Sequence, residues 1–338
     1  MNSPLDTPAA GPADSPAAGA PQKGPAACQK PPVVAVVGPT ATGKTRFGVE
    51  LALALDAEVI SCDSMQIYKG MSIGTAAPTQ EERRGVPHHM IGTVSPAQPY
   101  SVADYCRDAS ACIAGVLSRG RLPILVGGTG LYADSLLDGL SYPELPDAQP
   151  LRARLAAQAR REGLDALYRR LQQADPQTAA RLHPNDARRI IRALEVYEST
   201  GQPMSELARR ARGEPAYRCL RLGLDYCDRA LLYERIDRRV DLMMEQGLLG
   251  EVRALAAQPG VQGGTALAAI GYKEFLPLLR GEGSAADAVA AVKQASRRYA
   301  KRQRTWFYRH ADTHWFYRDL QDDNSILSQM ISLFHNTF

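Results

Sequence analysis

The sequence predicts an α/β fold in which a parallel sheet is interrupted by an inserted all-helical domain and followed by C-terminal helices. Three observations carry this prediction. Short apolar runs alternate with helical segments in the first third of the chain, a glycine-rich loop follows the first run, and a long Ala/Arg/Leu/Gln-rich stretch separates that region from a later strand. Strands that alternate with helices favour a parallel sheet joined by right-handed crossovers.

The composition is that of an ordinary globular protein. The chain has 338 residues, of which 45% are hydrophobic and 22% charged, enough for one large domain or two ordinary ones. No stretch approaches the roughly 18 uninterrupted apolar residues of a membrane-spanning helix. We therefore expect a cytoplasmic protein with no membrane partner, and we expect a monomer.

The first part of the chain is predicted to contain an extension followed by alternating strands and helices. Residues 1–32 hold 8 of the 23 prolines and 8 alanines, which predicts a disordered extension without a secretory signal. The apolar run 33–37 then suits a buried strand. Further strands are expected at 58–63 and 122–127, and helices at 44–55 and 103–118.

The second part of the chain begins where the composition changes to mostly Ala, Arg, Leu and Gln. A helical insertion domain is expected over 143–216, including a helix at 188–199 that Gly201 and Pro203 stop. The alternating residues 217–225 predict a return to the sheet, and long helices should follow. Helices are expected at 230–256 and 286–309. The α/β core is expected to comprise residues 33–142 and 217–318, followed by a tail at 319–338.

A phosphate-binding loop follows the first strand. The sequence GPTATGKT fits G-x-x-x-x-G-K-[ST] at every fixed position and lies between a predicted strand and a predicted helix, so the core is P-loop NTPase-like. Its backbone N–H groups can surround phosphate oxygens, Lys44 adds a positive charge, and the Thr45 hydroxyl can ligate Mg²⁺. The predicted diphosphate-binding residues are Gly38, Pro39, Thr40, Ala41, Thr42, Gly43, Lys44 and Thr45.

Polar residues follow two other predicted strands. Asp63 ends the second strand, and Thr129 follows the third. Ligands of open α/β sheets bind at the carboxyl ends of the strands, so both side chains are expected at the phosphate-binding edge, although Asp63 could instead only cap a turn. Residues 127–133 also match the dinucleotide pattern G-x-G-x-x-A, which we discount because a short G-x-G match is weak.

Positive charge is concentrated in two regions. Residues 150–218 contain 14 Arg and 8 acidic residues, and residues 293–310 contain 7 basic residues and no acid, in a chain whose net charge is only +4. Aromatic residues are interleaved in the second region, and helical spacing places Lys293, Arg297 and Lys301 on one face. This pattern favours contact with a nucleic-acid phosphate backbone; the alternative is a solvated basic helix.

The cysteines and histidines do not indicate a metal centre. The six cysteines form no Cys-x-x-Cys pair, so neither a zinc site nor a disulfide framework is expected. The pairs His88-His89 and His310/His314 lack a third ligand at a suitable spacing. The only expected metal is Mg²⁺ at Thr45.

Six sequence blocks, in order, resemble the tRNA dimethylallyltransferase family, also called tRNA isopentenyltransferases. They are GPTATGKT, ISCDSMQIYKGMSIGTA, LVGGTGLY, HPND with RRIIRALEVYESTG, AIGYKE and KRQRTWF, and the resemblance covers about residues 33–315. It implies a P-loop core with a helical insertion that uses Mg²⁺. It also implies transfer of the five-carbon group of dimethylallyl diphosphate to the exocyclic amine of adenine at tRNA position 37.

The resemblance also implies roles for individual residues. Asp63 stands where the family has its proposed general base, and Thr129 where it has a Thr that contacts both the tRNA and the reacting region. Ser64, Met65 and Gln66 would share the pocket of the target base. The implied tRNA-binding residues are Asp63, Ser64, Met65, Gln66, Thr129, Arg152, Arg188, Arg189, Ile190, Ile191, Arg192, Gly271, Tyr272 and Lys273.

The chain departs from the family pattern at a few positions. Ser72 and Ala77 replace an Asp and a Lys, and Ala268 stands where some relatives have Arg. These changes bear on the details of tRNA contact. The zinc finger of eukaryotic relatives has no counterpart after residue 310, which favours a bacterial-type member.

Two other functions share the P-loop. A small-molecule kinase would use the same loop and Mg²⁺ but would not need the two basic regions. An RNA-binding regulator that hydrolyses nucleotide would need a hydrolysing carboxylate pair, and no plain Walker-B strand is evident. The P-loop alone predicts ATP binding, whereas we expect the prenyl diphosphate to be its occupant.

Overall fold

The fold is a six-stranded, wholly parallel sheet. The computed structural model describes residues 30–140, 148–211 and 213–338. The strand order is β3-β2-β4-β1-β5-β6. Because all the strands are parallel, each connection between consecutive strands is a crossover, as in other doubly wound α/β sheets. The strands are β1 (Pro32–Val37), β2 (Ala57–Ser61), β3 (His88–His89), β4 (Leu122–Gly127), β5 (Arg218–Asp225) and β6 (Thr313–Tyr317).

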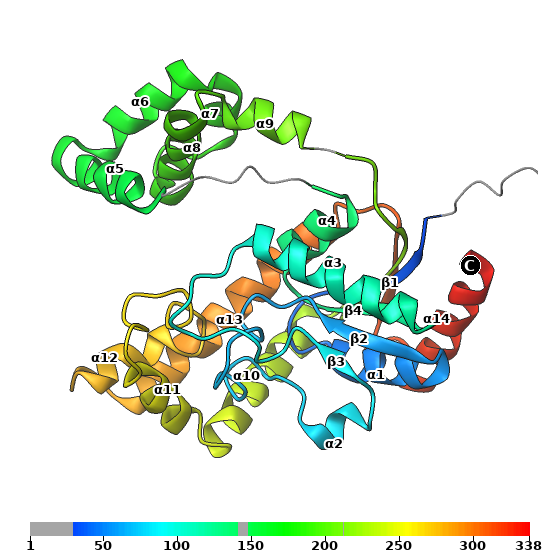
Figure 1. Ribbon diagram of the computed structural model, residues 1–338. Helices are drawn as coiled ribbons and strands as arrows, with labels where there is room; N and C mark the ends of the chain where they lie inside the picture. Colours follow the sequence, from blue (N-terminus) through cyan, green and yellow to red (C-terminus); the bar gives the residue numbers. More distant parts are fainter. Residues whose placement is uncertain (1–29, 141–147, 212) are drawn as a thin grey trace, which may run out of the picture. The chain divides into compact units, whose positions relative to one another are not determined.

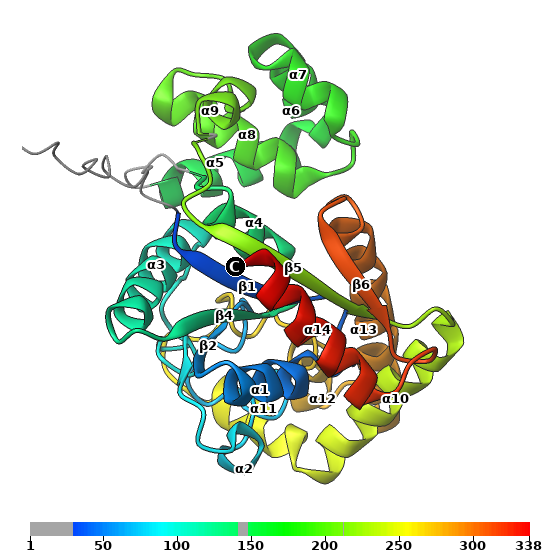
Figure 2. The same ribbon diagram turned by 90° about the vertical axis from the view of Figure 1, so that its right-hand side faces the viewer.

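Successive residues of β1 enter two different hydrophobic cores, because side chains alternate across a strand. Val33, Ala35 and Val37 join the core formed with α3 (Val102–Ser118), α4 (Gly130–Leu137), α10 (Arg229–Glu245), α11 (Leu248–Ala256) and α13 (Ala285–Phe307). Val34 and Val36 join the core formed with α1 (Lys44–Ala54) and α14 (Asp323–Thr337). Figure 2 shows α1 and α14 in front of the central strands. The sheet is therefore covered on both faces.

The register brings the carboxyl ends of the central strands together. Val37 of β1 pairs with Gly127 of β4 and Gly223 of β5, so the loops after β1 and β4 leave the sheet at the same level. Ser61 of β2 pairs with Val126 of β4. The residues that follow β1, β2 and β4 therefore meet at one edge, as the sequence predicted.

Two strands and one helix break were not predicted. β3 is only two residues long, and β6 is a short run rich in aromatic residues that lies beyond the basic segment 293–310. The expected helix over 230–256 is two helices, because Gly247 has φ +97°, a left-handed conformation that an α-helix does not contain. The second strand ends at Ser61, so Asp63 lies in the loop after it.

The insertion contains its own small core, which gives the helical domain a physical basis. Leu155, Leu167, Leu171, Ile190 and Leu194 are buried against one another and not against the sheet. Its helices are α5 (Ala148–Glu162), α6 (Leu164–Ala174), α7 (Pro176–Arg181), α8 (Ala187–Thr200) and α9 (Met204–Arg210). The extension 1–29 and the start of the insertion, 141–147, lie outside the described residues.

The last twenty residues are more than a tail. Within 319–338, α14 has an acidic N-cap, Asp322, and buries Ile326 and Met330 completely in the core beneath α1. The remaining helical pieces are α2 (Gln80–Arg83), a 3₁₀ turn at Lys273–Phe275 and α12 (Leu276–Leu279). In the described part of the chain, no helix is both long and apolar enough to cross a membrane.

Candidate active site

The P-loop connects β1 to α1 with an unusual backbone. Gly38 has φ +138°, and an added Cβ would lie 2.2 Å from the carbonyl oxygen of Leu224, so only glycine fits there. Gly43 is the N-cap of α1 and has φ +83°. Thr42 is fully buried and its hydroxyl donates to the carbonyl of Pro39 at 2.9 Å, which closes the loop on itself. The loop is therefore preformed around the N-terminus of α1.

Lys44 is the most strongly perturbed group at the P-loop. Its Nζ donates to the carbonyl oxygen of Pro39 at 2.6 Å, and burial, followed by the nearby charge of Arg239, lowers its pKa to about 7. Asp63 and Asp225 oppose this shift because their charges favour the ammonium form. A buried ammonium with a depressed pKa is poised to gain stabilisation from an anionic ligand.

Two arginines of α10 reach the P-loop, and the sequence analysis missed both. The Nε atom of Arg235 donates to the carbonyl of Ala41 at 3.2 Å, and Nη1 of Arg239 donates to the Thr40 hydroxyl at 3.3 Å. Burial lowers the pKa of Arg239, and the charge of Asp63 partly restores it. Their spacing of four residues on a helix was the available signal, but nothing in the sequence pointed that face toward residues 38–45.

Gln303 of α13 joins the P-loop to the end of β4 and was also missed. It accepts a hydrogen bond from the backbone N–H of Thr40 at 2.9 Å and donates to the carbonyl of Gly128 at 2.8 Å. Tyr299, one turn earlier, directs its hydroxyl at the same carbonyl at 3.4 Å, and burial raises its pKa. The basic segment 293–310 thus contributes buried polar groups to the site as well as surface charge.

Asp63 and Thr129 lie on loops at the predicted edge of the sheet, and Thr129 lines neither of the two cavities found there. One carboxylate oxygen of Asp63 accepts from the backbone N–H groups of Met65 at 2.8 Å and Gln66 at 3.2 Å. The Thr129 hydroxyl accepts from the N–H of Ser64 at 3.0 Å, which ties the loop after β2 to the loop after β4. Asp63 does end a turn, as the alternative interpretation held, but only one of its two oxygens serves that purpose among the described residues.

Two adjoining cavities meet at Asp63. A phosphate-side cavity of about 110 Å³ is lined by the P-loop, with Lys44 and Thr45 facing it. A larger cavity of about 390 Å³ lies beside it and is lined by Ser64, Met65 and residues of α10, α13 and the 268–273 segment. The residues that line both are Thr40, Asp63, Thr75, Arg239 and Tyr299. A carboxylate therefore stands between a cationic phosphate cradle and a space for a second molecule.

The residues expected to hold the target base divide between these cavities. Gln66 faces the phosphate-side cavity instead of the larger one. Its amide accepts from the Ser61 hydroxyl at 2.8 Å and donates to the carbonyls of Thr75 and Ala76 at 3.2 and 3.3 Å. Those bonds hold the wall of the site in place. Gly271 and Lys273 line the larger cavity, as does Ala268, the position of a departure from the family pattern.

Two predicted tRNA-binding side chains need correction because they are completely buried. Tyr272 is 0% exposed, and its hydroxyl donates to Glu251 at 2.6 Å. The Glu251 carboxylate also accepts the backbone N–H groups of Ser72, Ile73 and Gly74, so this pair fixes the 72–74 segment. Ile190 is likewise 0% exposed, in the core of the insertion. Both side chains support their exposed neighbours and do not offer a contact surface.

The arginines predicted in the insertion differ in their partners. Arg152 and Arg192 both bind Glu195, whose side chain is 0% exposed, at 2.8 and 2.9 Å. Arg189 lies 3.5 Å from Asp186, and Ile191 packs partly buried beside the insertion core. Arg188 lines the larger cavity. The predicted stretch 188–192 therefore places one arginine at the cavity itself.

The basic face of α13 is largely neutralised by acids from outside residues 293–310, which themselves contain no acid. Lys293 pairs with Asp241 at 2.6 Å, and Arg297 binds both oxygens of Asp237 at 2.5 and 2.6 Å. Arg304 pairs with the fully buried Asp225 at 2.7 Å. The first two acids come from α10, which lies beside α13 (Figure 1). Arg302 lines the larger cavity and stacks over the ring of Tyr299.

Two of the histidines in these pairs bond buried or half-buried carboxylates. His89 bonds the buried carboxylate of Glu58 at 2.7 Å, and His310 bonds Asp134 at 3.1 Å. Within the described ranges, no group of three or more His, Cys, Asp or Glu side chains could hold a metal ion. The Thr45 hydroxyl, which lines the phosphate-side cavity, is the group predicted to ligate Mg²⁺.

This arrangement defines a class of protein: a P-loop α/β protein with two adjoining cavities and a carboxylate between them. The comparisons with known proteins agree with that class. A family model described as IPP transferase matches residues 66–310, and one described as isopentenyl transferase matches residues 31–91. The chain belongs to the IPP transferase family.

Relatives of this family cover most of the chain. It is 47% identical over 287 residues to a tRNA dimethylallyltransferase of Bacillus subtilis, spanning 85% of this chain and 91% of that one. It is 46% identical over 289 residues to a tRNA dimethylallyltransferase of Caldanaerobacter subterraneus, spanning 85% and 92%. These bacterial relatives confirm the resemblance that the six sequence blocks indicated.

Solved structures show the same fold. A tRNA isopentenylpyrophosphate transferase from Bacillus halodurans superposes with a TM-score of 0.65 at 41% identity and covers 91% of this chain and 100% of its own. A eukaryotic dimethylallyltransferase described as acting on tRNA superposes with a TM-score of 0.75 at 31% identity, covering 89% and 77%. The predicted α/β core of P-loop type is thereby confirmed.

Proposed function

We propose that the protein transfers the dimethylallyl group of dimethylallyl diphosphate to the exocyclic amine of adenine at tRNA position 37, beside the anticodon, and releases diphosphate. The observation that supports this most strongly is the position of Asp63, which lines both the phosphate-side cavity and the larger cavity. In this assignment the diphosphate occupies the P-loop and the adenine occupies the larger cavity.

The reaction follows from this placement. The bond between C1 of the allyl group and the diphosphate oxygen breaks, and the amine nitrogen forms a new bond to C1. The amine's lone pair is delocalised into the adenine ring, so it needs a base to take its proton as the bond forms. The free oxygen of Asp63 accepts that proton. Thr129 holds the neighbouring Ser64 backbone, which keeps this loop in position.

The leaving group is stabilised by the P-loop. Lys44, Arg239 and the N–H groups at the start of α1 offset the negative charge that develops on the diphosphate. We propose that Mg²⁺ binds at the Thr45 hydroxyl, which faces this cavity, and that it supplies further charge neutralisation when bound. The chain's own contribution is a preformed, cationic site.

The tRNA must present an unstacked base. Extruding it costs a few kcal/mol, which contacts to the phosphate backbone can offset. Arg188, Lys273 and Arg302 line the larger cavity and supply positive charge where the anticodon loop would enter. Because one chain furnishes both cavities, we propose that the enzyme works as a monomer. We also propose that it works in the cytoplasm.

The test is product analysis with a control for position. Purified protein is incubated with tRNA and labelled dimethylallyl diphosphate, and the tRNA is digested to nucleosides. We expect one labelled, prenylated adenosine, and no product from a tRNA with guanine at position 37. A parallel reaction with γ-labelled ATP and no prenyl donor tests the kinase alternative, which phosphate transfer to a small molecule would support.

A further inference from the structure

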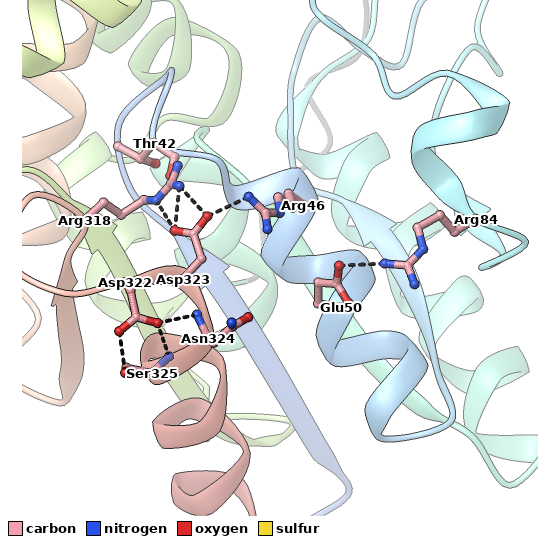
Figure 3. Close-up of polar contacts among 9 residues, drawn as sticks. All are labelled: Thr42, Arg46, Glu50, Arg84, Arg318, Asp322, Asp323, Asn324 and Ser325. Atoms are coloured by element: carbon pink, nitrogen blue, oxygen red, sulfur yellow. Dashed lines mark hydrogen bonds and ion pairs between the residues drawn. The ribbon is translucent and has the colours of Figure 1, made fainter.

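The segment that follows β6 reaches back to the P-loop from the opposite end of the chain. Arg318 follows β6, and its Nη1 donates to the carbonyl oxygen of Thr42 at 3.2 Å (Figure 3). We propose that Arg318, held by Asp323, is a positioning residue that orients a backbone donor of the diphosphate site. This inference rests on the proposed function only in taking the ligand of the P-loop to be a diphosphate.

Arg318 is held on several sides. Its Nε and Nη2 donate to the Asp323 carboxylate at 3.1, 2.6 and 2.8 Å, and its guanidinium lies 5.4 Å from the centre of the Phe47 ring. Asp323 also accepts from Arg46 of α1 at 2.6 Å. The side chain of Arg318 is only 12% exposed. Bidentate, partly buried ion pairs of this kind have a fixed geometry, which long surface pairs lack.

The bond to Thr42 determines which way its peptide faces. In a trans peptide the carbonyl of Thr42 and the N–H of Gly43 point in opposite directions. Arg318 holds that carbonyl, so the Gly43 N–H is directed to the other side of the peptide. Gly43 lines the phosphate-side cavity. It is also the residue against which Arg318 packs, since an added Cβ would lie 2.5 Å from Nη1.

Arg318 acts through the backbone and not as a direct phosphate ligand. It is not among the described residues that line either cavity, and its charge is balanced by Asp323. Asp323 in turn begins α14, whose preceding residue Asp322 caps the helix by accepting from the N–H groups of Asn324 and Ser325. The buried Ile326 anchors the helix in the core. The C-terminal helix thereby sets the position of the loop.

The experiment compares variants for binding of inorganic diphosphate with Mg²⁺, measured by titration calorimetry. Arg318→Ala should weaken this binding about 10-fold, because a charged hydrogen bond that fixes a phosphate donor is lost. Arg318→Lys should restore part of the affinity, since it keeps the charge but cannot hold both Thr42 and Asp323. The affinity for tRNA should stay within about twofold of wild type, because its contacts lie in the other cavity.

A second ion pair that involves α1 offers a matched control. Arg84 pairs with Glu50 of α1 at 2.6 Å, an exposed ion pair that touches no P-loop residue (Figure 3). Arg84→Ala should leave diphosphate binding unchanged. Asp323→Asn provides a milder variant should Arg318→Ala fail to fold, and it should weaken diphosphate binding about threefold, because Arg318 keeps its bond to Thr42 but loses its rigid partner.

The outcomes separate this inference from the proposed function. Diphosphate affinity within twofold of wild type in Arg318→Ala, or in Asp323→Asn if only that variant folds, would overturn the inference. Equal losses of diphosphate and tRNA affinity would also overturn it, since a general structural defect explains both. If the wild-type protein binds diphosphate and Arg318→Ala weakens that binding, but the wild-type protein prenylates no tRNA, the inference stands and the proposed function is refuted.

Discussion

The phosphate-side cavity at the P-loop and the basic helix α13 both present cations, yet they use them differently. At the P-loop, Lys44 and Arg239 point into one small cavity and burial lowers the pKa of both. On α13, Lys293 and Arg297 are paired with acids of α10 and are neutralised before any ligand arrives. The number of basic residues in a segment therefore does not give the unpaired positive charge that a ligand meets there.

The difference follows from what each ligand requires. A diphosphate is small, so its site can concentrate charge in a preformed cradle. A tRNA is large, and its contacts are spread over many phosphates that each contribute a little. Single substitutions should therefore have large effects at the first region and small effects at the second. Four predictions follow that contrast, from the largest expected effect to the smallest.

Asp63→Asn should lower the single-turnover rate by about 10²–10⁴-fold, because the amide keeps the shape of the carboxylate but cannot accept the proton. The fold and tRNA binding should be retained, since asparagine can still accept the N–H groups of Met65 and Gln66. Rapid-quench kinetics with bound tRNA measures the rate. A rate near wild type would remove Asp63 from the role of general base.

Lys44→Ala should weaken dimethylallyl diphosphate binding about 100-fold, because the diphosphate loses the ammonium that balances its charge at the P-loop. Thr45→Ala should weaken the donor and Mg²⁺ by a smaller factor. Both variants should bind tRNA within about threefold of wild type, because neither residue lines the larger cavity. Filter binding of tRNA is the check, and parallel losses of donor and tRNA would contradict the separation of the two cavities.

Replacing Lys301 and Arg302 by Ala should flatten the log–log dependence of tRNA affinity on salt by about 1.4 to 1.8 units, at 0.7 to 0.9 per phosphate contact. Replacing Lys293 and Arg297 should change it little, since Asp241 and Asp237 already neutralise them. The two double variants lie on the same helix and differ in whether acids of α10 already pair with the replaced cations. Equal slopes in the two double variants would mean that α13 binds no phosphate through its free cations.

The donor should bind with uptake of a proton. Burial and the charge of Arg239 lower the pKa of Lys44 to about 7, so above that pH the free protein holds it mostly neutral. A bound diphosphate favours the charged form, so affinity should fall as pH rises above about 7, by at most tenfold per unit. Calorimetry at about pH 8.5 in buffers of different ionisation enthalpy counts the proton. Zero uptake would contradict the depressed pKa.

The sequence predicted the elements whose signals are local. The P-loop needs a strand, glycines, a lysine and a helix within a dozen residues, and β1, residues 38–45 and α1 supply them in order. Asp63 and Thr129 were found because parallel strands end at one edge. The division of the insertion was visible in composition, and the structure supplies its separate core.

What the sequence could not show are contacts between distant segments. Gln303 meets Thr40 across 263 residues, and Arg318 meets Thr42 across 276. Neither the register of α13 nor the docking of α14 is encoded in a local pattern. The pairing of Arg297 with Asp237 was hidden for the same reason, because the neutralising acids lie on another helix. The family resemblance implied Tyr272 and Ile190 as contact residues, but their burial depends on segments that pack against them, which the sequence does not show.

The contrast between a compact donor site and a distributed tRNA surface is tested most directly by one salt titration of the wild-type protein with both ligands. The affinity for tRNA should fall linearly on a log–log plot with a slope of several units, whereas the affinity for dimethylallyl diphosphate should fall much less steeply. Equal slopes for the two ligands, or a tRNA affinity that does not respond to salt, would contradict the account.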